Sequence, residues 1–358
     1  MDGNAIILTD GLLNQYPAKT AHGLIRGTER YNIIGVIDAV SAGSDAGEVV
    51  DGKPRGIKVY SDLTDFLKSS EEKADYCLVG IAPKGGKLPA AMKKTIKEAI
   101  IQGINIVSGL HEYLSDMPDL ASLADEYNVQ LVDVRKPKPK SELHFWTGRI
   151  LDVAAPRVAV LGTDVRMGKR TTTRMLTQAA EAAGLKAQMI FTGQTGWMQG
   201  RGKGFILDST YNDFVSGELE HAIVSSYEEH QPDVIFVEGQ AALRNPSGPC
   251  GSEYLVSGQI KYVVLQHAPA RVYFDDNEDL GFKIPPISTE IQLIELYGAE
   301  VLAVTLNTAG LSLEEAKAYQ QQYQQELGLP VILPLEDGVG QIIDLVKEVL
   351  EKEASAAL

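Results

Sequence analysis

The sequence predicts an α/β protein with two domains, each built on a mainly parallel sheet. Three observations predict this fold class. The chain has 358 residues, which is more than one ordinary domain needs. Short apolar runs typical of buried parallel strands alternate with helical patterns in two separate series. A stretch of alternating prolines and lysines, 135–148, separates the series and favours extended, solvated backbone.

The first series predicts a Rossmann-like domain over residues 1–138, followed by a linker over 139–150. Its expected strands are 5–8, 33–38, 75–82, 104–108 and 129–134, and its clearest helices are 63–73 and 88–103. No Gly-x-Gly-x-x-Gly motif follows the first strand, so dinucleotide binding is not expected. The loops 82–89 and 108–116, the second with His111 and Glu112, are either plain turns or part of a binding crevice.

The second series predicts another α/β domain over residues 151–358. Its expected strands are 157–162, 187–193, 233–239, 261–267, 299–307 and 330–334. Its clearest helices are 171–184, 311–328 and 340–353. The long polar helix 311–328 is either a solvated surface or part of an interface, and we expect a homo-oligomer.

Composition narrows the class of protein. A net charge of −15 argues against a nucleic-acid partner. No apolar run approaches the ~20 residues that cross a bilayer, so no membrane association is expected. The two cysteines, Cys77 and Cys250, lack the spacing of a metal or redox motif, which favours a reducing cytoplasm.

The stretch "LGTDVRMGKRTTTRML", 161–176, carries the strongest chemical signal. It follows an expected strand and opens an expected helix, the context in which loop amides and the helix dipole bind phosphate. We expect two glycines of this loop to adopt positive φ and a lysine to supply charge. The candidate phosphate ligands are Gly162, Thr163, Asp164, Arg166, Gly168, Lys169, Arg170, Thr171 and Thr172. These features make the second domain P-loop NTPase-like, against the alternative of an ordinary turn.

The loop departs from the Walker A pattern at two places. Five residues, not four, separate Gly162 from Gly168, and Arg170 follows Lys169 where Ser or Thr would hold Mg²⁺. Thr171 or Thr172 could hold the metal if the helix starts one residue later, and magnesium chemistry would then use Thr171 and Glu238 as ligands. A loop without a proper magnesium ligand suits a ligand held by its phosphates and not cleaved there, such as coenzyme A.

Polar residues after the other strands of the second domain are candidates for catalysis, because strand ends form the crevice of an open parallel sheet. Glu238, His267 and Asp208 are candidates for a general base. His267 has the alternative of being an ordinary core histidine. Two further acidic residues nearby, Glu218 and Glu220, are expected on an exposed helix face.

Other side chains in this domain are candidates for holding a substrate. Arg244 and Arg271 have the geometry to hold carboxylates bidentately. Gln194 and Thr195 lie in the glycine-rich stretch 191–204, which is either a ligand-wrapping loop or a flexible solvated one, and Gln240 follows Glu238 at a strand end.

Several of these motifs, taken in order, resemble the DUF1611 family across nearly the whole chain. They are "VVDGKPRGIKVYSDL", "VGIAPKGGKLP", "IVSGLHEYLSD", "VDVRKPK", "GTDVRMGKRTT", "FTGQTGWM", "VEGQAAL" and "LQHAPAR". Members include D-glutamate N-acetyltransferases that use acetyl-CoA, and the phosphate loop is more distantly similar to that of dethiobiotin synthetase. In relatives the segment after Glu-Gly-Gln often runs through Gly-Ser to a His-Pro pair, whereas this chain has Ala241-Ala242 and then Asn245-Pro246.

The resemblance implies an N-acetyltransferase that moves acetyl from acetyl-CoA to the amine of a small anionic amino acid, D-glutamate in the first instance. A Mg-ATP-dependent ligase or kinase is the alternative implied by dethiobiotin synthetase. A non-catalytic sensor of nucleotide or coenzyme A is a third. Because Arg170 cannot ligate a metal, the sequence favours the first over the second.

Overall fold

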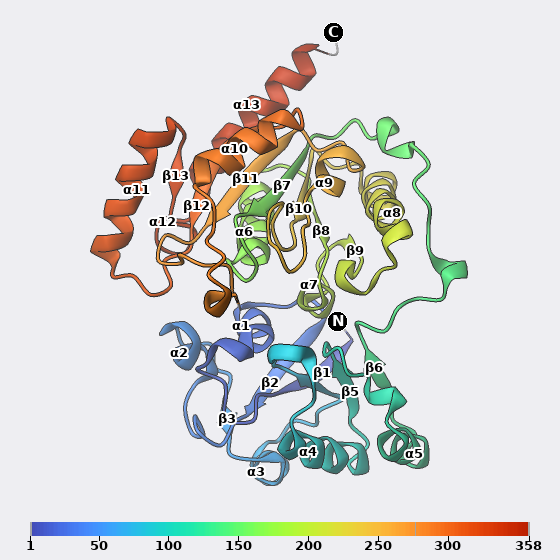
Figure 1. Ribbon diagram of the computed structural model, residues 1–358. Helices are drawn as coiled ribbons and strands as arrows, with labels where there is room; N and C mark the ends of the chain where they lie inside the picture. The colour runs from blue at the N-terminus through green and yellow to red at the C-terminus, as the bar shows by residue number, and fades with distance from the viewer. Residues whose placement is uncertain (1, 276, 357–358) are drawn as a thin grey trace. The chain divides into compact units, whose positions relative to one another are not determined.

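The computed structural model describes residues 2–275 and 277–356, and it divides into two compact units. The first unit comprises 1–138 together with 193–201, and the second comprises 139–192 together with 202–358. The short segment 193–201 therefore belongs to the first unit, although the second unit flanks it on both sides in the sequence. Both units are α/β, as the sequence predicts (Figure 1).

The first unit is a six-stranded parallel sheet in the order β3-β2-β1-β4-β5-β6. This is the strand order of a Rossmann-like domain. Its strands are β1 (Gly3–Leu8), β2 (Tyr31–Ile37), β3 (Val59–Tyr60), β4 (Tyr76–Val79), β5 (Asn105–Ser108) and β6 (Leu131–Asp133). Its helices are α1 (Lys19–Arg26), α2 (Ala46–Asp51), α3 (Leu63–Ser69), α4 (Ala90–Ile101), α5 (Pro118–Tyr127) and α7 (Gln194–Gln199).

The second unit is a seven-stranded parallel sheet in the order β13-β12-β11-β7-β10-β8-β9. Its strands are β7 (Arg157–Gly162), β8 (Ala187–Phe191), β9 (Lys203–Gly204), β10 (Val234–Glu238), β11 (Tyr262–His267), β12 (Glu300–Leu306) and β13 (Val331–Ile332). Its helices are α6 (Lys169–Ala182), α8 (Asn212–His230), α9 (Ser252–Val256), α10 (Ile287–Leu296), α11 (Leu313–Leu327), α12 (Pro334–Asp337) and α13 (Gly340–Ala356).

Helices cover both faces of the second sheet, because side chains alternate along each buried strand. Val158 and Val160 of β7 pack in one core with α6 and α13, whereas Ala159 and Leu161 pack in the other with α8, α9 and α10. In Figure 1, α11 flanks β13 at one edge of this sheet and α8 lies at the other. Strand β7 is central, so the loop that follows it lies between the loops after β10 and β11.

The acidic residues Glu218 and Glu220 were expected on an exposed face of α8, and this expectation is wrong. Only 2% and 3% of these residues is exposed. Glu220 accepts hydrogen bonds from the amides of Thr147 (2.6 Å) and Ile150 (3.1 Å), and Glu218 accepts one from the amide of His144 (3.0 Å). The two carboxylates therefore fasten the connecting segment 144–150 to α8.

The segment 191–204 is not a flexible solvated loop either. Its central part is the helix α7, and Met198 on that helix is fully buried in the core of the first unit. Among the residues that the structure describes, every helix is too short or too polar to span a lipid bilayer.

Candidate active site

The loop between β7 and α6 has the form of a phosphate-binding loop with one unexpected feature. Gly168 has a φ of +99°, as expected, but Gly162 is not among the residues with positive φ. The second residue of the loop with positive φ is Arg166, at +55°. Gly162 is instead needed for space, because a Cβ there would lie 3.1 Å from Lys169 Cδ and 3.3 Å from the Gln266 carbonyl oxygen.

Helix α6 begins at Lys169, two residues before the expected start at Thr171. Its first backbone amides have no partner within the helix, and the positive end of the helix dipole adds to them. This 14-residue helix points its N-terminus into the loop. The arrangement is suited to binding an anion.

The Lys169 side chain lies within the loop. Its Nζ donates to the carbonyl oxygens of Asp164 (2.7 Å) and Ala241 (2.8 Å), and the residue is 6% exposed. Burial lowers the pKa of Lys169 to about 8, against the opposing effect of the Asp164 carboxylate. The amine is therefore still mainly protonated at pH 7.

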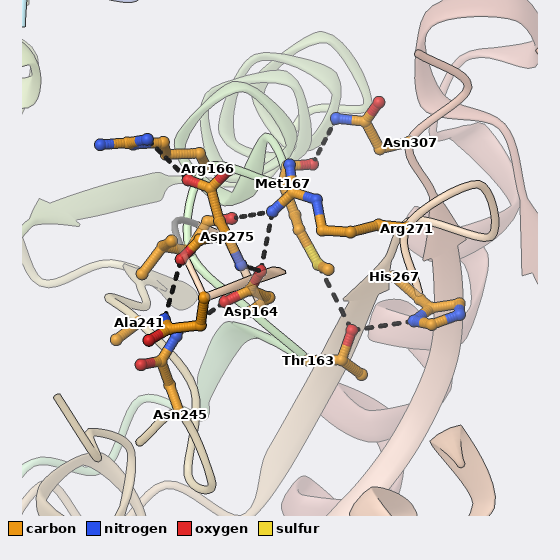
Figure 2. Close-up of polar contacts among 12 residues, drawn as sticks. Thr163, Asp164, Arg166, Met167, Ala241, Asn245, His267, Arg271, Asp275 and Asn307 are labelled. Carbon is orange, nitrogen blue, oxygen red and sulfur yellow. Dashed lines mark hydrogen bonds and ion pairs between the residues drawn. The ribbon is translucent and has the colours of Figure 1, made fainter. Parts of the chain in front are cut away.

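Asp164 holds the loop in place instead of facing a ligand. Its side chain is fully buried. One carboxylate oxygen accepts from Asn245 Nδ2 (2.7 Å), and the other accepts from Arg271 Nη1 (2.9 Å) and from the amide of Asp275 (2.8 Å), as Figure 2 shows. Asp164 thus joins three loops, and Arg271, expected to bind substrate, donates to this carboxylate.

His267 also supports the loop. Its Nδ1 lies 2.8 Å from the Thr163 hydroxyl, and its Nε2 lies 3.3 Å from the Tyr323 hydroxyl (Figure 2 shows the Thr163 contact). Burial, reinforced by Arg271, lowers the pKa of His267 to about 4. The imidazole is therefore neutral at pH 7, and both ring nitrogens face protein hydroxyls.

Threonines that follow Arg170 make hydrogen bonds within the protein. Thr172 donates to Gln266 Oε1 (2.6 Å), which also accepts from Thr305 (2.9 Å). Thr171 lies half-buried in the first turn of α6. Within 2–275 and 277–356 no group of three or more His, Cys, Asp or Glu side chains is placed to hold a metal ion.

Glu238 ends β10, beside the central strand β7, and is 4% exposed. Its Oε2 accepts from the amide of Thr192 (3.2 Å). Burial raises the pKa of Glu238. The positive charges of Arg170 and Lys169 oppose this shift, and Asp208 adds to it. Glu238, Asp208 and Arg170 are therefore electrostatic neighbours.

Three of the residues expected to bind substrate lie in other environments. Arg244 donates to Glu290 Oε2 (2.6 Å) and to the Thr289 hydroxyl (2.8 Å), so it is paired with the start of α10. Gln194 and Thr195 are buried residues of α7 in the first unit. The Thr195 hydroxyl lies 3.2 Å from that of Thr20.

Gln240 remains beside the candidate base. Its Nε2 donates to the Thr192 hydroxyl (3.0 Å), and that hydroxyl donates to the Glu238 carbonyl (2.7 Å). Gln240 and Thr192 therefore fix the backbone and the side chain of Glu238 together.

Sequence reasoning missed several residues that shape this site. Gln266 and Asn307 lie at the ends of β11 and β12, where the strand-end rule could have found them. Asn307 Nδ2 donates to the Met167 carbonyl (2.9 Å). Asn245 and Asp275 lie deeper in their loops, seven and eight residues after β10 and β11, and no motif marks them.

The comparisons agree with this architecture. The model of the P-loop domain of the DUF1611 family, described as a domain of unknown function, matches residues 144–343. The chain belongs to the DUF1611 family. The Rossmann-like N-terminal domain of the same family matches residues 40–137.

Relatives of this DUF1611 protein have been named and one has been solved. It is 30% identical over 280 residues to a D-glutamate N-acetyltransferase of Tritonibacter scottomollicae, covering 76% of this chain and 81% of the relative. It is 32% identical over 273 residues to a protein of the same name from Pseudoalteromonas sp., covering 74% and 79%. A DUF1611 crystal structure from Anabaena variabilis superposes with a TM-score of 0.86 at 29% identity, covering 96% and 99%. The first two relatives are N-acetyltransferases by name.

Proposed function

We propose that this DUF1611 protein transfers an acetyl group from acetyl-CoA to the amine of an acidic amino acid, with D-glutamate as the acceptor. The observation that carries the proposal is a buried carboxylate, Glu238, beside a phosphate-binding loop whose magnesium position is taken by Arg170. The names of the two relatives support the reaction and the acceptor.

The loop suits the phosphates of coenzyme A. Lys169 and the first amides of α6 would hold the pyrophosphate. Gly162 leaves the room that Lys169 needs to extend across the end of β7. Acetyl-CoA supplies the acetyl group as an activated thioester.

Glu238 is our candidate for the general base. A carboxyl whose pKa is raised by burial accepts a proton more readily than an exposed one. It would take a proton from the acceptor's ammonium group, so that the neutral amine can attack the carbonyl carbon of the thioester. The new C–N bond would replace the C–S bond, and the departing sulfur of coenzyme A would take up the proton that the attacking nitrogen loses. The Thr192 amide and the Gln240–Thr192 contact keep its side chain in one orientation.

Arg170 is our candidate for holding the acceptor's carboxylate. Arg170 is the positive charge with the largest effect on Glu238. A cation next to the base would place the amine of an amino acid within reach of Glu238.

Arg170 also favours an acetyltransferase over an enzyme that uses Mg-ATP. P-loop NTPases bind Mg²⁺ through the hydroxyl that follows the lysine, and a guanidinium cannot ligate a cation. Thr171 stands one position later than the hydroxyl of that motif, and the Thr172 hydroxyl donates to Gln266 Oε1. Binding of the donor should therefore not depend on magnesium.

Isothermal calorimetry with acetyl-CoA and with ATP, each with and without Mg²⁺, tests the proposal. We expect acetyl-CoA to bind equally well with and without the metal, and Lys169→Ala to abolish binding. Lys352→Ala, which removes a largely exposed lysine of α13, is the matched control and should bind normally. Acetyl transfer would then be assayed with D-glutamate, L-glutamate and D-aspartate.

Two outcomes of these experiments would contradict the proposal. Tight binding of ATP only in the presence of Mg²⁺, with no acetyl-CoA binding, would overturn the proposal in favour of a ligase or kinase. Acetyl-CoA binding without turnover of any amine would indicate a sensor.

A further inference from the structure

We infer that Arg166 forms a second anion subsite, separate from the one at Lys169, and that this subsite takes the 3′-phosphate of coenzyme A. The inference rests on the proposed use of acetyl-CoA and assigns a part of the ligand to each cation. It also gives Asp275 a role, as the carboxylate that occupies the subsite when the phosphate is absent.

The two cations of the loop point in different directions. Lys169 turns into the loop, toward the carbonyl oxygens of Asp164 and Ala241. Arg166 has left-handed backbone and extends outward, where its Nη1 lies 2.6 Å from Asp275 Oδ2. In Figure 2 the Arg166 guanidinium lies on the side of Asp275 remote from His267.

The Arg166–Asp275 pair is reachable from solvent. The two side chains are 22% and 15% exposed, whereas Asp164 at the centre of the network is fully buried. An anion in solution can therefore approach the Arg166 guanidinium at this edge of the network. A phosphate can therefore compete with the Asp275 carboxylate for the same guanidinium.

Asp275 is held as a stand-in for an anion. Its amide donates to Asp164 Oδ2 (2.8 Å), and its carbonyl accepts from Asn277 Nδ2 (3.0 Å). Backbone contacts therefore hold Asp275 in place while its carboxylate pairs with Arg166. Guanidinium binds carboxylate and phosphate in the same bidentate manner, and phosphate carries the larger charge.

Coenzyme A matches two diverging cations better than a nucleoside triphosphate does. It carries a pyrophosphate and, across the ribose, a separate 3′-phosphate, whereas the phosphates of ATP form one continuous chain. The pyrophosphate is accounted for by Lys169 and the amides of α6. The 3′-phosphate is the anionic group left for Arg166.

The test compares the dissociation constants of coenzyme A and 3′-dephospho-coenzyme A by calorimetry. For the unaltered protein we expect coenzyme A to bind at least about tenfold more tightly, the effect of one charge-assisted contact. Arg166→Gln should reduce the ratio to near one, with dephospho-coenzyme A binding unchanged. Arg166→Lys should retain an intermediate ratio.

Asp275→Asn provides an independent test with the opposite sign. Removing the competing carboxylate should tighten coenzyme A binding several-fold and leave dephospho-coenzyme A unaffected. Arg149→Gln is the matched control, because Arg149 pairs with Glu228 in an exposed ion pair of the same unit. It should leave both constants unchanged.

Three results would overturn the inference. Equal weakening of both ligands by Arg166→Gln would place Arg166 in the shape of the loop or at the pyrophosphate. If Asp275→Asn binds coenzyme A more weakly, Asp275 stabilises the loop and does not compete with the phosphate. If the unaltered protein binds neither ligand, the proposed function is overturned together with the subsite. This outcome differs from the first two because it is seen before any variant is made.

Discussion

At the scale of single residues, the environment of Glu238 predicts the pH dependence of the reaction. Burial raises its pKa, so the acid limb of kcat/KM should lie above the usual carboxyl range. Activity should rise with pH as Glu238 loses its proton. Glu238→Gln should lower kcat by about 10²- to 10⁴-fold, the usual contribution of a general base. Acetyl-CoA affinity should be preserved.

Asp208→Asn is the informative companion to that variant. Because the negative charge of Asp208 raises the pKa of Glu238, removing it should move the acid limb to lower pH and retain activity. A limb that does not move in Asp208→Asn, or full activity in Glu238→Gln, would remove Glu238 from the role of base.

His267 predicts a pH dependence of stability. Its pKa is lowered from 6.5 to about 4, so below pH 6.5 the unfolded chain binds a proton that the folded chain does not. The free energy of unfolding should therefore fall as the pH falls from 6.5 toward 4, by at most about 3 kcal/mol.

Urea unfolding of the protein and of His267→Gln at pH 7 and pH 5 measures this effect. The variant should be less stable at pH 7 and should lose less stability on acidification. His230→Gln, which removes a more exposed histidine at the end of α8, is the control. Equal acid sensitivity of His267→Gln and the unaltered protein would contradict the prediction.

The sequence predicted which residues gather at this site better than it predicted what they do. Asp164 and Arg271 were expected to face ligands, yet they pair with each other, because a buried carboxylate needs a cation and hydrogen-bond donors. The positive φ expected at Gly162 occurs at Arg166. Such pairings depend on loops that are distant in sequence, and no local pattern encodes them.

At the scale of elements, most long strands and helices were predictable, whereas several short ones were not. Strands β3 and β9 have two residues each, too few for a periodic signal. Helix α7 was not predicted, because glycines lie within it and on both sides of it. Tertiary contacts stabilise it instead, such as those of Gln199 Nε2 with the carbonyls of Gly23 (2.8 Å) and Gly27 (2.9 Å). The burial of Glu218 and Glu220 on α8 was not predicted, because glutamates in most helices are exposed to solvent.

The role of α8 leads to a prediction for its carboxylates. Glu220 accepts from the amides of Thr147 and Ile150 and from the Thr147 hydroxyl. Burial alone would raise its pKa, but these donors lower it. Glu220→Ala leaves the donors without an acceptor and should cost about 2 kcal/mol of stability.

Hydrogen exchange and limited proteolysis show which residues become less stable in Glu220→Ala. Residues 144–150 should exchange and be cleaved faster in Glu220→Ala, with donor binding unchanged. Glu229→Ala removes an exposed carboxylate from the same helix that pairs with Lys203 of β9, outside this segment, and should change neither. Equal protection of 144–150 in both variants would show that Glu220 does not fasten this segment.

At the scale of the whole molecule, the first unit is not a continuous stretch of chain. It needs residues 193–201, from which Met198 enters its core and Trp197 stacks against Arg30 at 4.1 Å. The isolated segment 1–138 lacks these contacts. Its core would keep an open site where Met198 packs, and the carbonyls of Gly23 and Gly27 would lose the Gln199 amide.

We therefore expect the fragment 1–138 to be less stable than the same residues in the full chain. Hydrogen exchange of β1, β4 and β5 compares the two directly, and protection should fall by about 3 kcal/mol or more in the fragment. Met198→Ala in the full chain should reproduce much of this loss, about 2–5 kcal/mol for a buried methionine. Leu280→Ala, which truncates an exposed side chain of the second unit, should leave these strands unchanged. Full protection in the isolated fragment would mean that 193–201 rests on the first unit without contributing to its stability. The cost of Met198→Ala would then have to be small as well, so the two experiments check each other.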